Sequence, residues 1–319
     1  MKTIYARLLT PSTYNPFLPK KVTIELTNNC NLKCKMCGIW AEQKKFAFPP
    51  EKLRELLRDE SMAGVCHVAL TGGEPFLLGN LLEYYSIIRK ESPQAYVNIS
   101  TNGYFPERVI AFLEKTKGEA ISIAISFDGV DSHDLIRGTE QSSKRLLDTA
   151  MRIKRLFPHV PLGLKMTITP FNYKEIYKTA AFCFGIGIPF RIKTMEKLEN
   201  YHNRHHSEIS EVNYDEGMKK SIVAQAKEML RLGMTTNRAY IKKLIRKYEG
   251  GEVRCPCEEK TLFIAVTGDV FLCRQKNSCG NIMKHPLSLI WKSPQRRDVE
   301  MQMRQCVEWK GNSLPFMHD

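Results

Sequence analysis

Short apolar runs rich in β-branched residues alternate with amphipathic stretches between Val22 and Glu196. This alternation is typical of repeated βα units that build a parallel sheet. The pattern predicts six strands, at Val22–Leu26, Cys66–Leu70, Ala95–Ser100, Ala120–Ser126, Leu162–Thr169 and Phe190–Thr194. It predicts five helices between them, at Glu51–Glu60, Leu78–Glu91, Pro106–Lys115, Ser142–Phe157 and Tyr173–Phe184.

Six βα units are too few for a complete eight-stranded barrel, so we expect an α/β fold with a partial (β/α)6, TIM-like barrel that is open on one side. Its chemistry should lie in the loops at the carboxyl ends of the strands. Tyr214–Gly250 predicts one or two amphipathic helices, and Thr261–Val266 with Val270–Cys273 predicts a hairpin. We therefore divide the chain into a barrel (1–200), a helical linker (201–250) and a small C-terminal module (251–319).

The composition indicates a globular protein of the cytoplasm. Hydrophobic residues make up 43% and charged residues 26% of the 319, and no apolar run reaches the length of a membrane span. Pro11, Asn15 and Pro16 interrupt any N-terminal signal core. The net charge of +14 is compatible with an acidic electron-donor protein, a phosphorylated substrate or nucleic acid, and by itself it selects none of them. Nucleic-acid binding is disfavoured, because the basic residues form no block interleaved with aromatic ones.

Seven of the ten cysteines fall into two groups, which in a reducing compartment indicates metal ligands rather than disulfides. The first group, Cys30, Cys34 and Cys37, lies on the loop after the first strand. Three thiolates can bind three irons of a [4Fe-4S] cluster and leave the fourth iron open. A structural zinc ion is the alternative, but it normally takes four protein ligands.

Further motifs follow the later predicted strands. Thr71-Gly72-Gly73-Glu74-Pro75 follows the second, Ser100-Thr101-Asn102-Gly103 the third, and Ser126-Phe127-Asp128-Gly129 the fourth, with Arg137 a little further on. With the CxxxCxΦC spacing, in which Φ is Met36, the chain resembles the radical S-adenosylmethionine (SAM) superfamily.

The resemblance implies a set of SAM-binding residues. Gly72, Gly73 and Glu74 would hold the amino group of SAM. The region of Ser100 and Asn102 would contact its ribose. The remaining residues expected at the cofactor, with a serine and an arginine near its carboxylate, are Met36, Ser126, Asp128 and Arg137.

The second cysteine group resembles the SPASM or shorter twitch extension of radical SAM enzymes. The resemblance implies one auxiliary [4Fe-4S] cluster bound by Cys255, Cys273 and Cys306, with Cys257 as the favoured fourth ligand and Cys279 as its rival. A zinc site is the alternative, because four thiols around a hairpin also describe a zinc ribbon.

The implied activity is reductive cleavage of SAM to a 5'-deoxyadenosyl radical, which removes a hydrogen atom from the substrate. We expect a small anionic metabolite, sugar derivative or cofactor precursor, because only about twenty residues precede the first strand and peptide-modifying relatives often carry a leader-binding domain there. A peptide (RiPP) maturase with a separate leader-binding protein is the second hypothesis. A non-catalytic iron-sulfur or zinc protein is the third. The electron donor would be an acidic protein such as flavodoxin or ferredoxin.

Three other features of the sequence receive a structural interpretation. His202, His205 and His206 are expected in a solvated linker, since no partner spacing supports a metal site. Cys66 and Cys183 are expected to be buried small apolar side chains.

Overall fold

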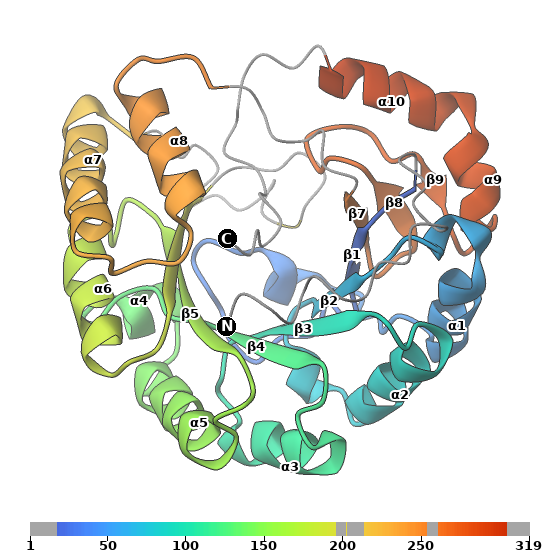
Figure 1. Ribbon diagram of the computed structural model, residues 1–319, viewed down its shortest axis with the longest axis horizontal. Coiled ribbons are helices and arrows are strands. Elements are labelled where there is room, and N and C mark those ends of the chain that lie inside the picture. Colours follow the sequence, from blue (N-terminus) through green and yellow to red (C-terminus); the bar gives the residue numbers. More distant parts are fainter. Residues whose placement is uncertain (1–17, 196–201, 203–213, 254–260, 305–319) are drawn as a thin grey trace.

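The computed structural model describes residues 18–195, 202, 214–253 and 261–304. Six parallel strands follow one another across the sheet in chain order, and each lies within one residue of its predicted bounds. They form the curved wall of a partial barrel (Figure 1), which confirms the predicted fold. The strands are β1 (Lys21–Glu25), β2 (His67–Thr71), β3 (Tyr96–Thr101), β4 (Ile121–Ser126), β5 (Leu162–Ile168) and β6 (Phe190–Thr194).

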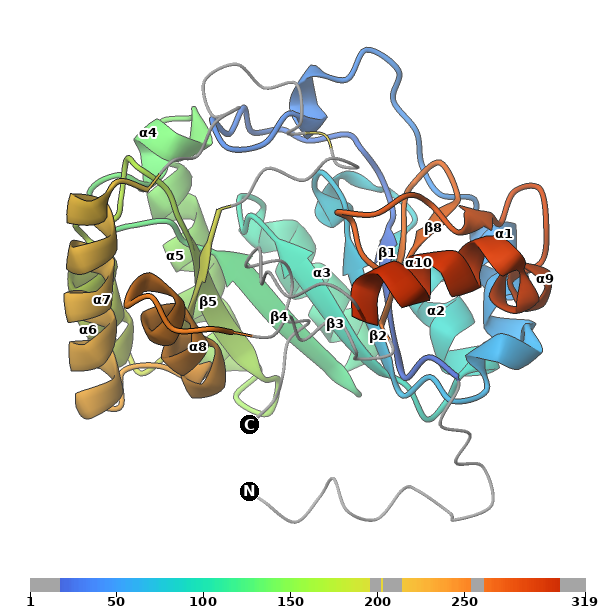
Figure 2. The ribbon, with the colours of Figure 1, turned by 90° about the horizontal axis from the view of Figure 1, so that it is seen from above.

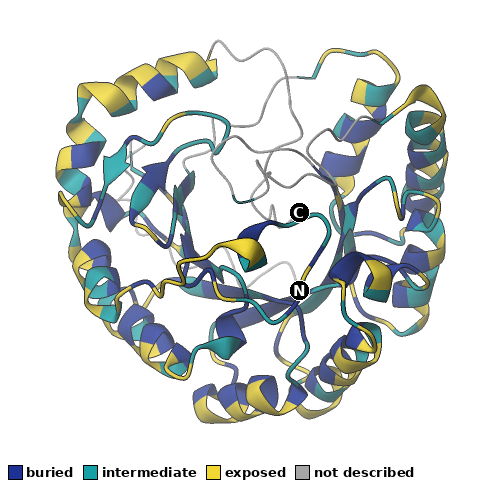
Figure 3. Cartoon of the chain, turned by 180° about the vertical axis from the view of Figure 1, so that it is seen from behind, coloured by how far each residue is buried: buried dark blue, intermediate teal, exposed yellow. Residues whose placement is uncertain are grey.

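Helices cover the convex side of this sheet. Their inner faces are buried against the strands and their outer faces are exposed (Figure 3). Alternate strand residues such as Ile24, Ile99 and Leu164 are fully buried beneath them, as the period-two pattern of a strand requires. The barrel helices are α1 (Pro50–Arg58), α2 (Leu81–Glu91), α3 (Pro106–Thr116), α4 (His133–Arg137), α5 (Ser142–Leu156) and α6 (Ile176–Gly185).

The five predicted helices are all present, with two differences at their starts. Helix α2 begins at Leu81 rather than Leu78, because Pro75–Leu77 forms a separate 3-10 turn capped by the Glu74 side chain. Helix α6 begins at Ile176 rather than Tyr173. The five-residue helix α4 was not predicted, since one turn carries too little periodicity to detect.

The one or two amphipathic helices predicted within Tyr214–Gly250 are two, α7 (Glu216–Arg231) and α8 (Arg238–Tyr248), and they continue the outer ring beyond α6. The Tyr240 hydroxyl accepts a hydrogen bond of 2.8 Å from the backbone N–H of Thr194 and so joins α8 to the end of β6. No helix in the described ranges is both long and apolar enough to cross a membrane.

The C-terminal hairpin is present and is continuous with the barrel sheet. Strand β7 (Thr261–Ile264) pairs in parallel with β1, β8 (Asp269–Phe271) pairs antiparallel with β7, and β9 (Gly280–Asn281) pairs antiparallel with β8. Helices α9 (Leu287–Lys292) and α10 (Pro294–Arg304) follow, and α9 packs beside the 3-10 turn that follows α1. The C-terminal strands therefore lengthen the wall on the β1 side.

Candidate functional site

The cysteine loop, residues 26–38, lies over one end of the barrel beside α4 (Figure 2). Cys34 is buried, whereas Cys30 and Cys37 are half-buried. The N–H of Lys35 donates to the carbonyl of Ile136 on α4 at 2.8 Å. The loop is therefore anchored by backbone to a helix that follows β4.

The same loop is anchored to the segment after β2 through two glycines. The Gly73 N–H donates to the Thr27 carbonyl at 2.6 Å. A Cβ on Gly72 would lie 2.3 Å from the Thr27 oxygen, and one on Gly73 would lie 2.0 Å from the Asn29 oxygen. Only glycine permits this approach, so the Gly-Gly pair brings the cysteine loop and the β2 loop into backbone contact.

Glu74 joins the ends of β2 and β3. Its fully buried carboxylate accepts hydrogen bonds from the Phe76 N–H at 3.0 Å, the Thr101 hydroxyl at 2.7 Å and the Asn102 N–H at 2.7 Å. Asn102 then donates from its side-chain amide to Asn31 of the cysteine loop at 2.9 Å. Burial raises the pKa of Glu74, and the three donors oppose that rise. The carboxylate thus positions two strand ends beneath the cysteine loop.

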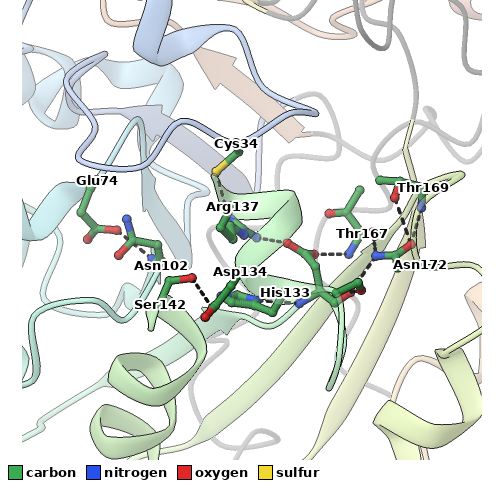
Figure 4. Close-up of polar contacts among 12 residues, drawn as sticks. Cys34, Glu74, Asn102, His133, Asp134, Arg137, Ser142, Thr167, Thr169 and Asn172 are labelled. Atoms are coloured by element: carbon green, nitrogen blue, oxygen red, sulfur yellow. Dashed lines mark hydrogen bonds and ion pairs between the residues drawn. The ribbon is translucent and has the colours of Figure 1, made fainter. Parts of the chain in front are cut away.

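Arg137 lies directly under Cys34 (Figure 4). Its Nη1 is 3.6 Å from the Cys34 sulfur, and its Nη2 forms a 2.5 Å ion pair with Asp128. A guanidinium at this distance favours the thiolate form of Cys34, although burial outweighs it and raises the pKa of that thiol. Arg137 is therefore a fixed positive charge beside the middle cysteine.

Asp128 is itself held from three sides. Its Oδ1 accepts the Thr167 N–H at 2.8 Å, its carbonyl accepts the Asn172 amide at 2.7 Å, and its N–H donates to His133 Nδ1 at 3.0 Å. Burial, with the adjacent Arg137, lowers the pKa of His133 to about 4, so the ring is neutral and can accept that bond. These contacts thus fix Asp128, the counter-ion of Arg137, at the end of β4.

The three thiols suit a cluster better than a single ion. Burial raises the pKa of Cys30 to about 11 and of Cys37 to about 12, so both sulfurs are poor thiolates until iron binds them. A tetrahedral zinc ion would draw its sulfurs to about 3.8 Å from one another. Among the described residues, no three metal-binding side chains are close enough to hold one ion. The three sulfurs nevertheless lie near one another, since Cys34 and Cys30 both act electrostatically on Cys37, as the three ligands of one cluster must.

Comparison with known families then decides the assignment, because residues 24–183, half of the chain, match the model of the Radical SAM superfamily. The chain belongs to the radical SAM superfamily. Residues 255–313 match the SPASM iron-sulfur cluster-binding domain. The chain is therefore an enzyme of this superfamily whose cofactors are SAM, a [4Fe-4S] cluster in the barrel and further iron-sulfur chemistry in the SPASM region.

Two curated radical SAM relatives illustrate the range of the match. The sporulation killing factor maturation protein SkfB of Bacillus subtilis is 29% identical over 177 residues, which are 54% of this chain and 41% of that protein. GTP 3',8-cyclase of Aquifex aeolicus is 26% identical over 177 residues, 54% of this chain and 55% of that protein. The match thus spans about half the length of these relatives.

Solved radical SAM structures share the fold. Streptococcus suis SuiB bound to S-adenosylmethionine superposes with a TM-score of 0.65 at 16% identity, over 88% of this chain and 68% of that one. The enzyme anSMEcpe with bound AdoMet gives a TM-score of 0.65 at 17% identity, over 88% and 82%.

The structure brings most of the predicted cofactor residues of this radical SAM chain together around the cysteine loop. Gly72, Gly73, Glu74 and Asn102 contact it through the β2 and β3 ends, and Arg137 contacts it from α4. The other predicted cofactor residues are Met36, which is half-buried, and Ser100, Ser126 and Asp128, which lie at the ends of β3 and β4.

The auxiliary site is only partly described. Cys255, Cys257 and Cys306 lie outside the described residues. Cys273 is half-buried after β8, whereas Cys279 is buried in the apolar core, which raises the pKa of its thiol to about 11.

Three residues differ from the sequence interpretation or were missed. His202 is half-buried rather than solvated, because its ring nitrogens lie 3.1 Å from Glu25 and 2.9 Å from Glu42; His205 and His206 lie outside the described residues. Cys66 is exposed, so its predicted burial is wrong, whereas Cys183 is fully buried as predicted. Lys165, whose ammonium donates to Ser100 at 2.9 Å, could not be found because parallel strand register is not legible in one sequence.

Proposed function

We propose that this enzyme cleaves SAM reductively beneath the cysteine loop and that the resulting radical removes a hydrogen atom from a substrate held in the barrel. The observation that carries the proposal is the position of Cys30, Cys34 and Cys37. Their loop is hydrogen-bonded to the Gly72-Gly73 backbone on one side, and Arg137 contacts Cys34 on the other. When bound, the reduced cluster supplies the single electron that cleaves SAM to methionine and a 5'-deoxyadenosyl radical.

The protein's own groups position these partners and exclude water. We assign the amino group of SAM to the Gly72, Gly73 and Glu74 segment and its ribose to the region of Ser100 and Asn102. Because the Glu74 carboxylate already accepts three hydrogen bonds, its part is to hold the backbone that meets the cofactor. The carboxylate of SAM is assigned to Ser126 and Arg137, and Met36 and Asp128 are assigned to the wider cofactor site.

A second cluster is proposed in the C-terminal region, with Cys255, Cys257, Cys273 and Cys306 as its ligands. Cys279 ranks below Cys257 because the core already surrounds it. An acidic electron donor such as flavodoxin or ferredoxin is proposed to dock near the exposed Lys33 of the cysteine loop, where opposite charges would steer it towards the cluster.

The substrate is proposed to be a small anionic metabolite, sugar derivative or cofactor precursor. A peptide substrate is the second candidate, favoured by the similarity to SkfB, which is named as a maturation protein. GTP 3',8-cyclase, whose name gives a nucleotide substrate, matches over an equal length, and this similarity supports the small anionic candidate in the same way.

The test is anaerobic reconstitution followed by iron and sulfide analysis and incubation with dithionite and SAM. We expect about eight irons per chain, two cubes of four, and release of 5'-deoxyadenosine. A variant with all three cysteines of the barrel loop replaced by alanine should lose about half the iron and all the product. Fully loaded protein that releases no 5'-deoxyadenosine would refute the proposal.

A further inference from the structure

The guanidinium of Arg137 is held between a cysteine and a carboxylate. Its Nη1 donates to the Cys34 sulfur at 3.6 Å, and its Nη2 pairs with Asp128 at 2.5 Å (Figure 4). Its Nε is buried and has no hydrogen-bond partner among the described residues. Both terminal nitrogens are thus engaged before SAM binds, and Nε remains as a donor for the carboxylate of SAM.

The backbone holds this arginine and this cysteine together from both sides. The Lys35 N–H, one residue after the cysteine, donates to the carbonyl of Ile136 at 2.8 Å. On the other side, a Cβ on Gly138 would lie 2.6 Å from the carbonyl oxygen of Lys33, so only glycine lets the end of α4 approach the loop this closely. The contact between the guanidinium and the sulfur is therefore built into the packing of α4 against the cysteine loop.

The charge of Arg137 acts on all three cysteines of the loop. Burial raises the pKa of each thiol, and Arg137 opposes that rise in every case. Two acids act in the other direction, since Asp128 raises the pKa of Cys34 and Glu74 raises that of Cys30. At Cys34 the electrostatic effect of Arg137 is larger than that of Asp128. The ion pair therefore acts on the middle cysteine as a net positive charge.

A positive charge beside a cluster ligand affects the redox chemistry of the cluster. Reduction adds a negative charge to a buried group, and surroundings of low dielectric make that charge costly. The potential of an iron-sulfur cluster depends on the net charge around it and on hydrogen bonds to its sulfurs, and Arg137 supplies both at Cys34. Its side chain is only 11% exposed, so water and salt screen its charge weakly.

We propose that Arg137 raises the reduction potential of the barrel cluster by donating a charged hydrogen bond to the Cys34 sulfur. This inference rests on the proposed function, because it concerns the cluster of that same site. It gives Arg137 a role before SAM binds, in addition to its contact with the carboxylate of SAM. Asp128 acts in the opposite direction, so the ion pair limits how far the potential rises.

The test is an anaerobic redox titration of the cluster-loaded full chain without SAM, followed by electron paramagnetic resonance. The signal that changes when SAM is added to a separate sample belongs to the barrel cluster, because its open iron binds SAM. Arg137→Met should lower the ratio of reduced to oxidised barrel cluster at a fixed potential at least tenfold, which corresponds to about 59 mV for one electron. Arg137→Lys keeps the charge but loses the fork, so its ratio should lie between those of Arg137→Met and wild type.

The sign of the shift at Asp128 separates an effect of charge from a structural defect. Asp128→Asn removes the negative charge and should raise the ratio, whereas damage to the cysteine loop would shift both variants in the same direction. The matched control is Arg152→Met, which neutralises an arginine paired with Glu107 on the outer helices and should leave the ratio within about twofold of wild type.

Equal ratios in wild type and Arg137→Met, or shifts of the same sign at both positions, would overturn the inference. If Arg137→Met binds no barrel cluster, the sign of the Asp128→Asn shift decides alone. Absence of 5'-deoxyadenosine from wild-type protein would count against the proposed function only, because the order of the potentials is measured without SAM.

Discussion

The contact between the two loops can be tested by adding a single methyl group at Gly73. The new Cβ of Gly73→Ala would lie 2.0 Å from the Asn29 oxygen and 3.0 Å from the Cys30 Cβ, whereas ordinary contact begins near 3.4 Å. The cysteine loop must therefore move by about 1.4 Å, because the obstructing atoms are backbone rather than a flexible side chain. Overpacking of this kind costs about 1–3 kcal/mol of unfolding free energy.

The catalytic cost should be larger than the loss of stability suggests. A misplacement of about 1 Å can slow a positioned reaction about 100-fold, so we expect the rate of 5'-deoxyadenosine release to fall by about that factor. The matched control is Gly79→Ala, whose Cβ would meet nothing within 4 Å and should leave the rate unchanged. If Gly73→Ala retains the wild-type rate and iron content, the two loops are not held as described.

Three other substitutions probe separate parts of the site. Cys34→Ser should lower the iron content by about four per chain, as measured by colorimetric iron analysis, while Cys66→Ser should leave it unchanged. Asp128→Asn leaves the buried Arg137 charge without its counter-ion and should destabilise the protein by about 3 kcal/mol in chemical denaturation; an unchanged midpoint would contradict the ion pair's role. Burial lowers the pKa of His202, but the two carboxylates raise it more, so its contribution to stability is complete below about pH 6.5 and is lost as the pH rises through the raised value. Melting temperatures of wild type and His202→Gln should therefore converge with increasing pH, and a constant difference would refute this bridge.

The strands were predictable because each carries a strong local pattern, and so was the cysteine trio because its spacing is specific. The reason for the Gly72-Gly73 pair was not predictable. Two adjacent glycines allow the backbone to approach either a ligand or another loop. The packing of the two loops shows that Gly73 approaches the backbone of Asn29. The bridge from His202 to Glu25 was missed for a similar reason, since 177 residues separate its partners in the chain.

The inward direction of Lys165 could not be predicted either, because it depends on contacts between distant parts of the chain. Lys165 stands between apolar neighbours in a strand whose pattern also suits an exposed lysine, and only its register beside β4 shows that it points inward. Cys66 shows the opposite error, because a position at the start of a core strand does not ensure burial: the residue lies one position before β2 and remains exposed.

The pairing of β1 with β7 has a consequence for how the chain folds during synthesis. About 240 residues separate Lys21 from its partner Thr261. At about 5–20 residues per second, the ribosome needs about 12–48 s to supply β7 after β1 has emerged. Throughout that interval the strand that leads into the cysteine loop remains an unpaired edge, open to wrong pairing with other chains. Shortening the chain before Thr261 would make this temporary exposure permanent, so the hairpin protects the edge of the completed barrel as well as extending its sheet.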